Sequence, residues 1–492
     1  MTKLSCTLHG SDIHSALMSE NRNPQIYMSQ PLTMTVGAAI AVLLLTPGLT
    51  ARSGEFTDVA ATFGDAVTLT GIHHTTTTNP DGTGINFWTT DYEGADATLA
   101  SLSNPHMAGA DAFGNVYIAD KASHAILKIA ADGSIHTFAG THQMGFNGDG
   151  PAPATTLQIA FPNGLYVLPD GTVYVLDPGN HRIRRVGTDG IMTTIVNDTD
   201  PGWDPSGRAL WVSSDESLIY YTHEYPPIPP SLISSGATVK KWTPGNGIEV
   251  VCSKAVGFRN PANIAVNPVD GKLYVTDRAE EDTTKLATGL FRIDGDEQRT
   301  RMTGNTTQPK AADGQLALNS FIEGTRGITF LPNGSYFLCA HKGGDVWFVD
   351  TAGILHRFIQ GSGKGDTYGI TVGQHPPMLG KNYMSQPRAV TLAPNGDLLV
   401  IANDSGYVFR LPYTSTPSLP QNLRVHYAGT GVRLDWQGVA GRGYRIERSV
   451  DLQPESWIPV GASAGQMGGA CSFVDKPTLY PHHAYYRVLP SL

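Results

Sequence analysis

The sequence predicts an all-β fold, a six-bladed β-propeller followed by a small β-sandwich, and two observations support it. One cassette recurs six times between residues 104 and 414: an apolar run, a turn containing glycine, a second apolar run, a short polar loop and a third apolar run. A period of about 45 to 65 residues with several short strands is typical of a β-propeller. The composition agrees, because 55 Gly and 33 Pro indicate many turns while 40% apolar residues suffice for a core.

The first 51 residues are predicted to be an export leader. The apolar stretch Val36–Leu45 is followed by a Pro-Gly break and by small residues ending at Ala51, which is the pattern of a secretory signal peptide. That stretch is too short to cross a bilayer. We therefore expect a secreted or periplasmic protein, with no integral membrane segment in the mature chain.

The propeller is predicted to span residues 55–414, and the cassette at 161–186 shows its strands most clearly. Apolar runs at 165–168, 172–176 and 182–186 predict three strands, and residues 192–196 predict a fourth. Pro-Asp-Gly between the first two runs is a tight turn, because Pro fixes φ and Gly accepts positive φ. The other cassettes should follow the same layout. They occupy residues 104–129, 208–225, 260–278, 325–349 and 386–411.

The ring is expected to close with chain that precedes the first cassette. The segments Asp65–Ile72 and Gly84–Thr90 have the composition of strands. We predict that both pair with the last blade, because closure removes the exposed sheet edges that otherwise favour aggregation.

After the propeller, residues 415–421 are predicted to be a linker, marked by Pro417 and Pro420. Residues 422–492 contain short alternating strands, with Trp436 and Tyr444 at spacings that suit a small β-sandwich. This region resembles a fibronectin type III module. The resemblance implies a spacer or an adhesive unit, with no catalytic role.

The cassettes themselves resemble NHL repeats, and the run "PNGLYVLPDGTVYVLDPGNHRIRRV" is close to the consensus of that family. The resemblance covers about residues 95 to 414 and implies a six-bladed propeller. The same run is similar to the gluconolactonase and senescence-marker family, in which the Asn of Pro-Asn-Gly binds a divalent ion. Carried over, that residue is Asn163. The family also needs a Glu opening an early blade and an Asp near a later one, and here the corresponding openings carry His106 and Ala262-Asn263.

The candidate binding residues open the first strands of the six cassettes. In an antiparallel blade the start of the first strand and the end of the second lie on one face, so these positions should surround one mouth of the central channel. They are His106, Asn163, Arg208, Asn263 (beside Ala262), Arg326 and Arg388. Arginine presents a planar fork that matches carboxylate, sulfate or phosphate oxygens. The arginines either bind an anionic partner or pair with loop carboxylates, and both interpretations are open.

A second ring of candidates follows the second strands. It consists of Asp120, Asp177, His223, Glu224, Asp277 and His341. Carboxylate and amide oxygens suit Ca²⁺ and imidazole suits Zn²⁺, so one divalent cation is a possible cofactor, with Asn163, His223 and His341 as candidate ligands. The aspartates have an alternative interpretation, because aspartate side chains often hold turns together.

Charge excludes one class of partner. With 34 Lys and Arg against 43 Asp and Glu, the net charge is −9, so the chain lacks the basic surface that nucleic-acid binding requires. We expect a binding module whose channel mouth takes an anionic small molecule, a glycan or a protein. The alternative is a divalent-metal-dependent lactonase or lyase that acts on a sugar-derived substrate through the same mouth.

Overall fold

The structure is a computed structural model. It describes residues 4–7, 15–17, 53–64, 66–72, 74, 78–80, 84–200, 209–227, 234–278, 288–342, 344–361, 386–403, 406–413, 421–428, 431–438, 443–449, 457–464, 470–475 and 483–490. Its regular secondary structure is mainly β-strands, with one α-helix among the described residues, and the sheets between residues 67 and 411 form a propeller. No helix among these residues has the length and apolar character needed to span a membrane.

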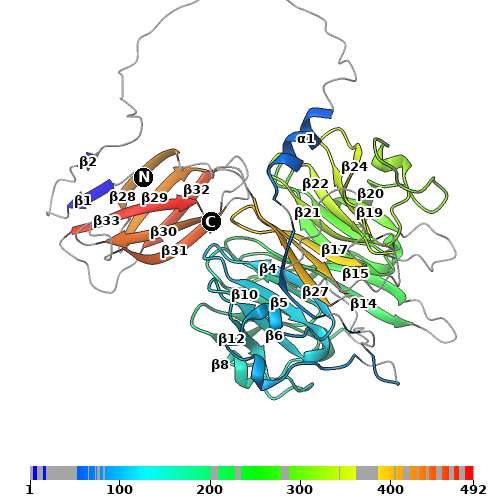
Figure 1. Cartoon of the computed structure of the whole chain (residues 1–492), viewed down its shortest axis with the longest axis horizontal. Coiled ribbons are helices and arrows are strands. Elements are labelled where there is room, and N and C mark those ends of the chain that lie inside the picture. Colours follow the sequence, from blue (N-terminus) through cyan, green and yellow to red (C-terminus); the bar gives the residue numbers. More distant parts are fainter. Residues whose placement is uncertain are drawn as a thin grey trace, which may run out of the picture.

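Six antiparallel sheets follow one another between residues 67 and 411 of the described chain (Figure 1). The first contains β4 (Pro105–Ala110), β5 (Val116–Asp120), β6 (Ala125–Ile129) and β7 (Ile135–Gly140). The second contains β9 (Gly164–Val167), β10 (Val173–Asp177), β11 (Arg182–Val186) and β12 (Ile191–Asn197), with β8 (Ala152–Pro153) at its edge. The third contains β13 (Leu210–Val212), β14 (Ile219–Pro227), β15 (Ser234–Thr243) and β16 (Gly247–Cys252).

The remaining three sheets repeat this order. The fourth contains β17 (Pro261–Val266), β18 (Leu273–Asp277), β19 (Gly289–Gly295) and β20 (Gln298–Arg301). The fifth contains β21 (Thr325–Phe330), β22 (Tyr336–Ala340), β23 (Val346–Val349) and β24 (Leu355–Ile359). The sixth contains β25 (Pro387–Leu392), β26 (Leu398–Ala402), β27 (Tyr407–Leu411) and β3 (Val67–Thr70).

The first strands of the sheets contact one another in a closed circle. Contacts join β4 to β9, β9 to β13, β13 to β17, β17 to β21, β21 to β25 and β25 back to β4. Each sheet is antiparallel, and its first strand is the one that takes part in this circle. The starts of all six first strands therefore lie at one end of a common axis.

The ring closes with strand β3, which pairs with β27 in the sixth sheet. This confirms the predicted pairing of the segment Asp65–Ile72. The second segment, Gly84–Thr90, contains no strand, so that part of the prediction is wrong. Side chains take its backbone donors instead: Phe87 N donates to Ser103 Oγ at 2.8 Å and Trp88 N to Asn86 Oδ1 at 3.0 Å.

The core lies between neighbouring sheets, and the central strands are buried along their whole length. All five residues of β5, β10, β18, β22 and β26 are buried. Each apolar cluster joins two sheets; Leu127 and Leu399, for example, belong to one cluster of the first and sixth sheets. Both faces of a central strand are covered in this arrangement, which explains its uninterrupted apolar run.

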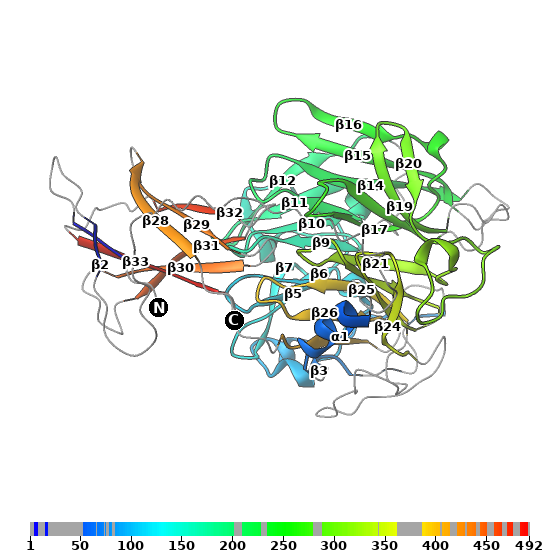
Figure 2. The same cartoon turned by 90° about the horizontal axis from the view of Figure 1, so that it is seen from above.

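The C-terminal strands form two further sheets around a separate core. One contains β28 (Gln421–Ala428), β29 (Gly431–Gln437) and β32 (Ala470–Asp475). The other contains β30 (Gly443–Ser449), β31 (Ile458–Ala464) and β33 (His483–Pro490), extended by β1 (Leu4–Thr7) and β2 (Ser15–Leu17). Trp436, Tyr444 and Tyr486 are buried in their shared cluster. Figure 2 shows these strands as a group apart from the propeller sheets. The apolar stretch of the predicted leader and residues 415–420 of the predicted linker lie outside the described residues, and residue 421 of that linker already begins β28.

Candidate functional site

The predicted channel-mouth positions coincide with a repeated β-bulge. In four sheets the pairing of the first two strands shifts at the second residue of the first strand. The residues at these shifts are His106, Ala262, Arg326 and Arg388. A bulge redirects the side chain of the extra residue and interrupts the ladder. The backbone therefore presents the same position of four sheets in the same way, and Asn263 lies one residue beyond it in the fourth sheet.

A left-handed residue precedes the first strand of the first, second and sixth sheets. Asn104, Phe161 and Gln386 have φ of 67°, 55° and 47°, a region that bulky side chains rarely adopt. Phe161 is held there by His124, whose Nδ1 accepts from Phe161 N at 3.2 Å. The turn that leads into the channel mouth is thus a repeated, sterically costly conformation that its surroundings maintain.

Arg388 and His106 join the sixth sheet to the first at the channel mouth. Arg388 Nη1 donates to His106 Nε2 at 3.1 Å, and His106 Nδ1 lies 2.9 Å from the carbonyl oxygen of Asn104. Arginine can only donate, so Nε2 accepts and Nδ1 carries the proton that it donates to Asn104. His106 is buried while Arg388 is partly exposed. The imidazole ring of His106 is therefore neutral, and its Nε2 lone pair accepts a hydrogen bond from the guanidinium group of Arg388.

Arg326 lies in the neighbouring fifth sheet at the same position as Arg388. A Cβ at Gly327 would lie 2.6 Å from Val390 N and 2.8 Å from Ala389 Cα. Glycine is therefore required for β21 and β25 to approach each other at this point. The close approach brings the backbones of the two arginines side by side at one end of the channel.

Contacts across the ring link other sheets at this end. Asn263 Nδ2 lies 3.7 Å from Met107 Sδ, which connects the fourth sheet to the first. Thr276 Oγ1 donates to the carbonyl oxygen of Arg326, and it lies 3.4 Å from that of Asn263. The structure thus brings together four predicted residues, which are His106, Asn263, Arg326 and Arg388. Asn163 is buried immediately before β9, and Arg208 lies outside the described residues.

The aspartates of the second ring hold the turns that lead into the first strands. Asp120 Oδ1 accepts from Ser103 N at 2.7 Å, and Asp177 Oδ1 accepts from Ala160 N at 2.7 Å. Asp277 accepts from the backbone nitrogens of Arg259 and Asn260 at 2.8 and 3.0 Å. Burial raises the pKa of Asp120 to about 7 and that of Asp177 to about 6. These contacts support the interpretation of the aspartates as residues that hold turns.

His341 also makes a contact between sheets. Its Nδ1 lies 3.3 Å from the carbonyl oxygen of Gln386, the residue before β25. The carbonyl can only accept, so Nδ1 donates. This bond ties the fifth sheet to the sixth next to the channel mouth, and His341 is buried there.

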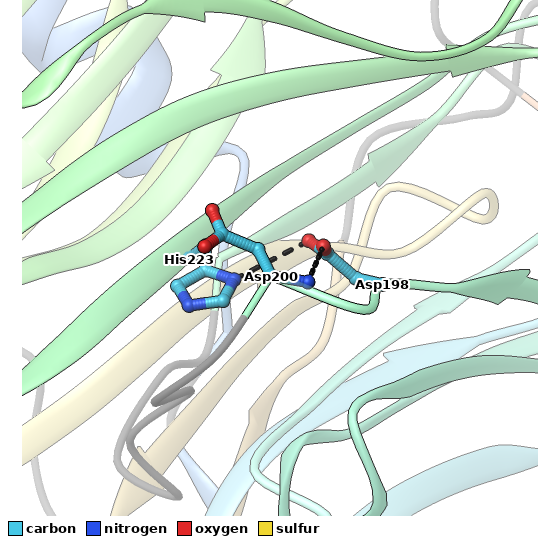
Figure 3. Close-up of side chains that lie close together, drawn as sticks. All are labelled: Asp198, Asp200 and His223. Atoms are coloured by element: carbon cyan, nitrogen blue, oxygen red, sulfur yellow. Dashed lines mark hydrogen bonds and ion pairs between the residues drawn. The ribbon is translucent and has the colours of Figure 1, made fainter.

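His223 belongs to a different group, which joins the second sheet to the third (Figure 3). Ligand atoms of Asp198, Asp200 and His223 lie within 4.8 Å of one another. His223 Nδ1 is 3.3 Å from Asp198 Oδ2, and Glu224 is buried next to it on β14. The two aspartates follow β12, in a connection whose sequence carries no metal-ligand spacing. The sequence analysis therefore missed them.

Lys240 occupies the position that a metal ion would take in this group. Its Nζ donates to Asp198 Oδ2 at 2.8 Å and to Asp200 Oδ2 at 3.0 Å, and its side chain is buried. Burial alone would raise the pKa of Asp198, but hydrogen bonds from His223 and Lys240 outweigh it and hold that pKa well below its ordinary value. A divalent cation would have to displace the ammonium group.

Neither group of described residues fits a divalent cation as arranged. At the channel mouth Arg388 engages the lone pair of His106 and adds positive charge, and Arg326 adds a second charge. Between the second and third sheets Lys240 supplies the positive charge. The arrangement suits recognition of anionic oxygen atoms by arginine.

Comparisons with known proteins identify one repeat and the fold. Residues 160–186 match the family model of the NHL repeat, and no curated protein matches the chain. A structural genomics protein of unknown function from Bacteroides thetaiotaomicron is similar at 14% identity with a TM-score of 0.50, over 70% of this chain and 75% of that chain. A gluconolactonase from Xanthomonas campestris has 15% identity and a TM-score of 0.41, over 71% and 97%. Virginiamycin B lyase from Staphylococcus aureus has 16% identity and a TM-score of 0.37, over 67% and 91%. At 14% identity the first similarity concerns the fold alone.

Proposed function

We propose that this chain is an exported six-bladed NHL-type propeller with a fibronectin type III-like module, and that its channel mouth binds an anionic small molecule or an acidic glycan. The closed circle of six first strands supports six blades. Two sheets around one aromatic core support the C-terminal module.

The observation that carries the binding proposal is the placement of Arg326 and Arg388. They occupy the same bulge position in neighbouring sheets whose backbones approach closely at Gly327. Both side chains carry a positive charge, and a bound anion would offset the repulsion between like charges at this end of the channel. His106 keeps one of them in place without adding charge, because its ring is neutral. A carboxylate, sulfate or phosphate group is the chemistry that such a pair recognises.

Isothermal titration with glucuronate tests this proposal. Hydrogen bonds to charged groups contribute about 1.5–3 kcal/mol, so Arg388→Gln and Arg326→Gln should each weaken binding by about tenfold to a hundredfold. The matched control is Arg182→Gln, because Arg182 already has a carboxylate partner, Asp149, at 2.7 Å. Binding that is equal in the wild type and both mouth variants would show that the mouth is not the site.

The alternative, a divalent-metal-dependent lactonase or lyase, draws on the Asp198, Asp200 and His223 group. Lys240 argues against it, since its ammonium already bridges both carboxylates. Elemental analysis of the dialysed protein by plasma mass spectrometry separates the two functions. We expect no stoichiometric divalent metal, whereas one equivalent that is lost in His223→Ala would favour the enzyme.

A further inference from the structure

A row of four partly exposed rings runs from the first sheet to the second. We call Trp88, His142, His124 and Phe161 the aromatic row. The rings of Trp88 and His142 are parallel, with centres 4.8 Å apart and an interplanar angle of 2°. His124 meets Phe161 edge to face, with ring centres 4.8 Å apart. Burial, Lys121 and His142, in that order, lower the pKa of His124. The two imidazole rings are therefore neighbours, and the row is continuous.

The antiparallel sheets place the aromatic row at the same end of the propeller as the channel mouth. In a four-stranded antiparallel sheet, the first and third strands begin at the end where the second and fourth strands finish. His124 directly precedes β6, His142 follows β7 by two residues, and Phe161 precedes β9 by three. Asn86 holds Trp88 beside them, because its Oδ1 accepts from Trp88 N at 3.0 Å and its Nδ2 lies 3.4 Å from the carbonyl oxygen of His142.

One hydrogen-bonded turn joins the aromatic row to an arginine of the mouth. The carbonyl oxygen of Asn104 accepts from Lys121 N at 3.3 Å, and the same oxygen accepts from His106 Nδ1. Lys121 Nζ lies 5.9 Å from the ring centre of Phe161, while His106 Nε2 accepts from Arg388. The row and Arg388 therefore lie on two sides of the same turn.

The rings of the row offer uncharged apolar faces. Burial lowers the pKa of His124 and that of His142 to about 4, so both imidazoles are neutral at neutral pH. Thr89 and Gln143, the sequence neighbours of Trp88 and His142, are exposed and provide hydroxyl and amide groups beside these faces. The C–H face of a sugar ring packs on an aromatic ring, and its hydroxyl groups need hydrogen-bond partners around the contact. Apolar rings bordered by polar side chains therefore have the chemistry that recognises a sugar.

The backbone of Phe161 provides a second, independent observation. Its φ of 55° lies in the left-handed region, which a bulky residue rarely adopts, and His124 holds it there through its hydrogen bond from Phe161 N. Asn104 and Gln386 occupy the corresponding positions, directly before Pro105 and Pro387. The turn itself thus does not require an aromatic residue. The ring of Phe161 is held at a conformational cost, which is frequent at ligand sites.

We propose that the ligand of the channel mouth is an acidic oligosaccharide long enough to pass over this turn. Its acidic sugar binds Arg388 and Arg326, and a neighbouring sugar of the same chain packs on the aromatic row. This inference rests on the function proposed for the mouth, and it narrows the ligand from any anion to a chain of at least two sugars. The arginines supply the positive charge for the acid, and the row supplies a contact that a single small anion does not use.

Isothermal titration with glucuronate and with cellobiouronate, in which glucuronate is linked to glucose, tests the aromatic row because both probes carry one negative charge. The wild type should bind cellobiouronate about tenfold more tightly than glucuronate, since only the disaccharide reaches the row. Trp88→Leu and Phe161→Leu should each lose most of that preference and keep the affinity for glucuronate within about twofold of the wild type. Trp88→Tyr keeps an aromatic face and should keep the preference.

Phe56→Leu is the matched control. The ring of Phe56 stacks on His356 with centres 4.7 Å apart and an interplanar angle of 6°, so this pair resembles the stack on Trp88. Its neighbour Glu55 accepts from Asn333 in the turn between β21 and β22, at the end of the propeller opposite to the starts of the first strands. Phe56→Leu should therefore bind both sugars as the wild type does.

The outcomes separate this inference from the function on which it rests. Equal affinity of the wild type for glucuronate and cellobiouronate overturns the role of the row and leaves anion binding at the mouth intact, and so does a preference that Trp88→Leu and Phe161→Leu retain. If neutral cellobiose binds as tightly as cellobiouronate, or if Arg388→Gln binds cellobiouronate as the wild type does, the function proposed for the mouth fails as well. Absence of saturable binding of either acid overturns both.

Circular dichroism melting curves show which variants are folded. Gln143→Ala changes only an exposed side chain, so it keeps the test available if a leucine variant does not fold. We expect Gln143→Ala to weaken the binding of cellobiouronate and not that of glucuronate, and equal affinity of this variant and the wild type for cellobiouronate would contradict a sugar beside His142.

Discussion

At the scale of single residues, corresponding positions of different sheets carry different amino acids that serve different purposes. Asp120 and Asp177 hold turns through backbone nitrogens, and the register places His223 at the corresponding position of the third sheet. In the third sheet the ammonium group of Lys240 forms ion pairs with Asp198 and Asp200, which lie in the connection between the second and third sheets. The sequence could predict the turn aspartates, because an Asp ends the second apolar run of the first, second and fourth cassettes. It could not predict Lys240, whose contact with Asp198 joins residues in two different sheets.

Asp120 leads to a prediction about pH. Burial raises its pKa from 3.8 to about 7 in the folded chain, so the folded state binds more protons than the unfolded state between these values. The stability that this group contributes is therefore fully present below about pH 4 and is lost as the pH rises towards 7. Asp120→Asn keeps an oxygen acceptor for Ser103 N but does not titrate. The free energy of unfolding of the variant, relative to the wild type, should increase from pH 4.5 to 7.5.

Urea unfolding at pH 4.5 and 7.5 measures this difference in the free energy of unfolding. The change between the two pH values decides the outcome, because any destabilisation by the buried amide that does not depend on pH cancels. Asp132→Asn is the control, since Asp132 is exposed on a turn of the same sheet. Parallel pH profiles for Asp120→Asn and the wild type would contradict the assignment of a raised pKa to Asp120.

At the scale of elements, the repeated cassette made the strands predictable. The β-bulges, and the side chains that accept hydrogen bonds from the backbone, could not be predicted. The apolar runs at 165–168 and 172–176 correspond closely to β9 and β10. Neither the bulges at Arg326 and Arg388 nor the close approach of β21 and β25 at Gly327 can be recognised in a local sequence pattern. Similarly, Gly84–Thr90 has the composition of a strand, but Ser103 and Asn86 capture its backbone donors.

A prediction at this scale concerns helix α1 (Ser53–Ala61), which packs against the fifth sheet. The ring of Phe56 stacks on His356 with centres 4.7 Å apart and an interplanar angle of 6°. Glu55 accepts from Thr351 Oγ1 at 2.7 Å and from Asn333 Nδ2 at 3.0 Å. Phe56→Ala should lower the free energy of unfolding by about 1–3 kcal/mol, since it removes a partly buried aromatic side chain.

Asp58→Asn, an exposed change on the same helix, is the control and should leave the free energy of unfolding within about 0.5 kcal/mol of the wild type. Urea unfolding curves of the two variants provide the comparison. If Phe56→Ala were as stable as Asp58→Asn, α1 would not fasten the fifth sheet in solution.

At the scale of the whole molecule, the propeller has no single central core, and its stability depends on the closure of the ring. Each apolar cluster lies between two neighbouring sheets, so every sheet needs both neighbours. The sixth sheet is assembled from β25, β26 and β27 together with β3, which precedes all the other strands of the ring in the chain. Composition and repeats could predict this closure, because a circle of repeats requires one sheet shared by the two ends of the ring.

Loss of β3 should therefore have consequences that loss of the chain before residue 65 alone does not have. A variant that begins at residue 73 leaves the edge of β27 unpaired, and an unpaired edge is a template for another chain. We expect this variant to form dimers or larger species in size-exclusion chromatography with light scattering, whereas a variant that begins at residue 65 should stay monomeric. A peptide of residues 65–72 should restore the monomer of the shorter variant by adding the missing strand. If the variant that begins at residue 73 were monomeric and melted at the same temperature as the one that begins at residue 65, the pairing of β3 with β27 would not be what closes the ring.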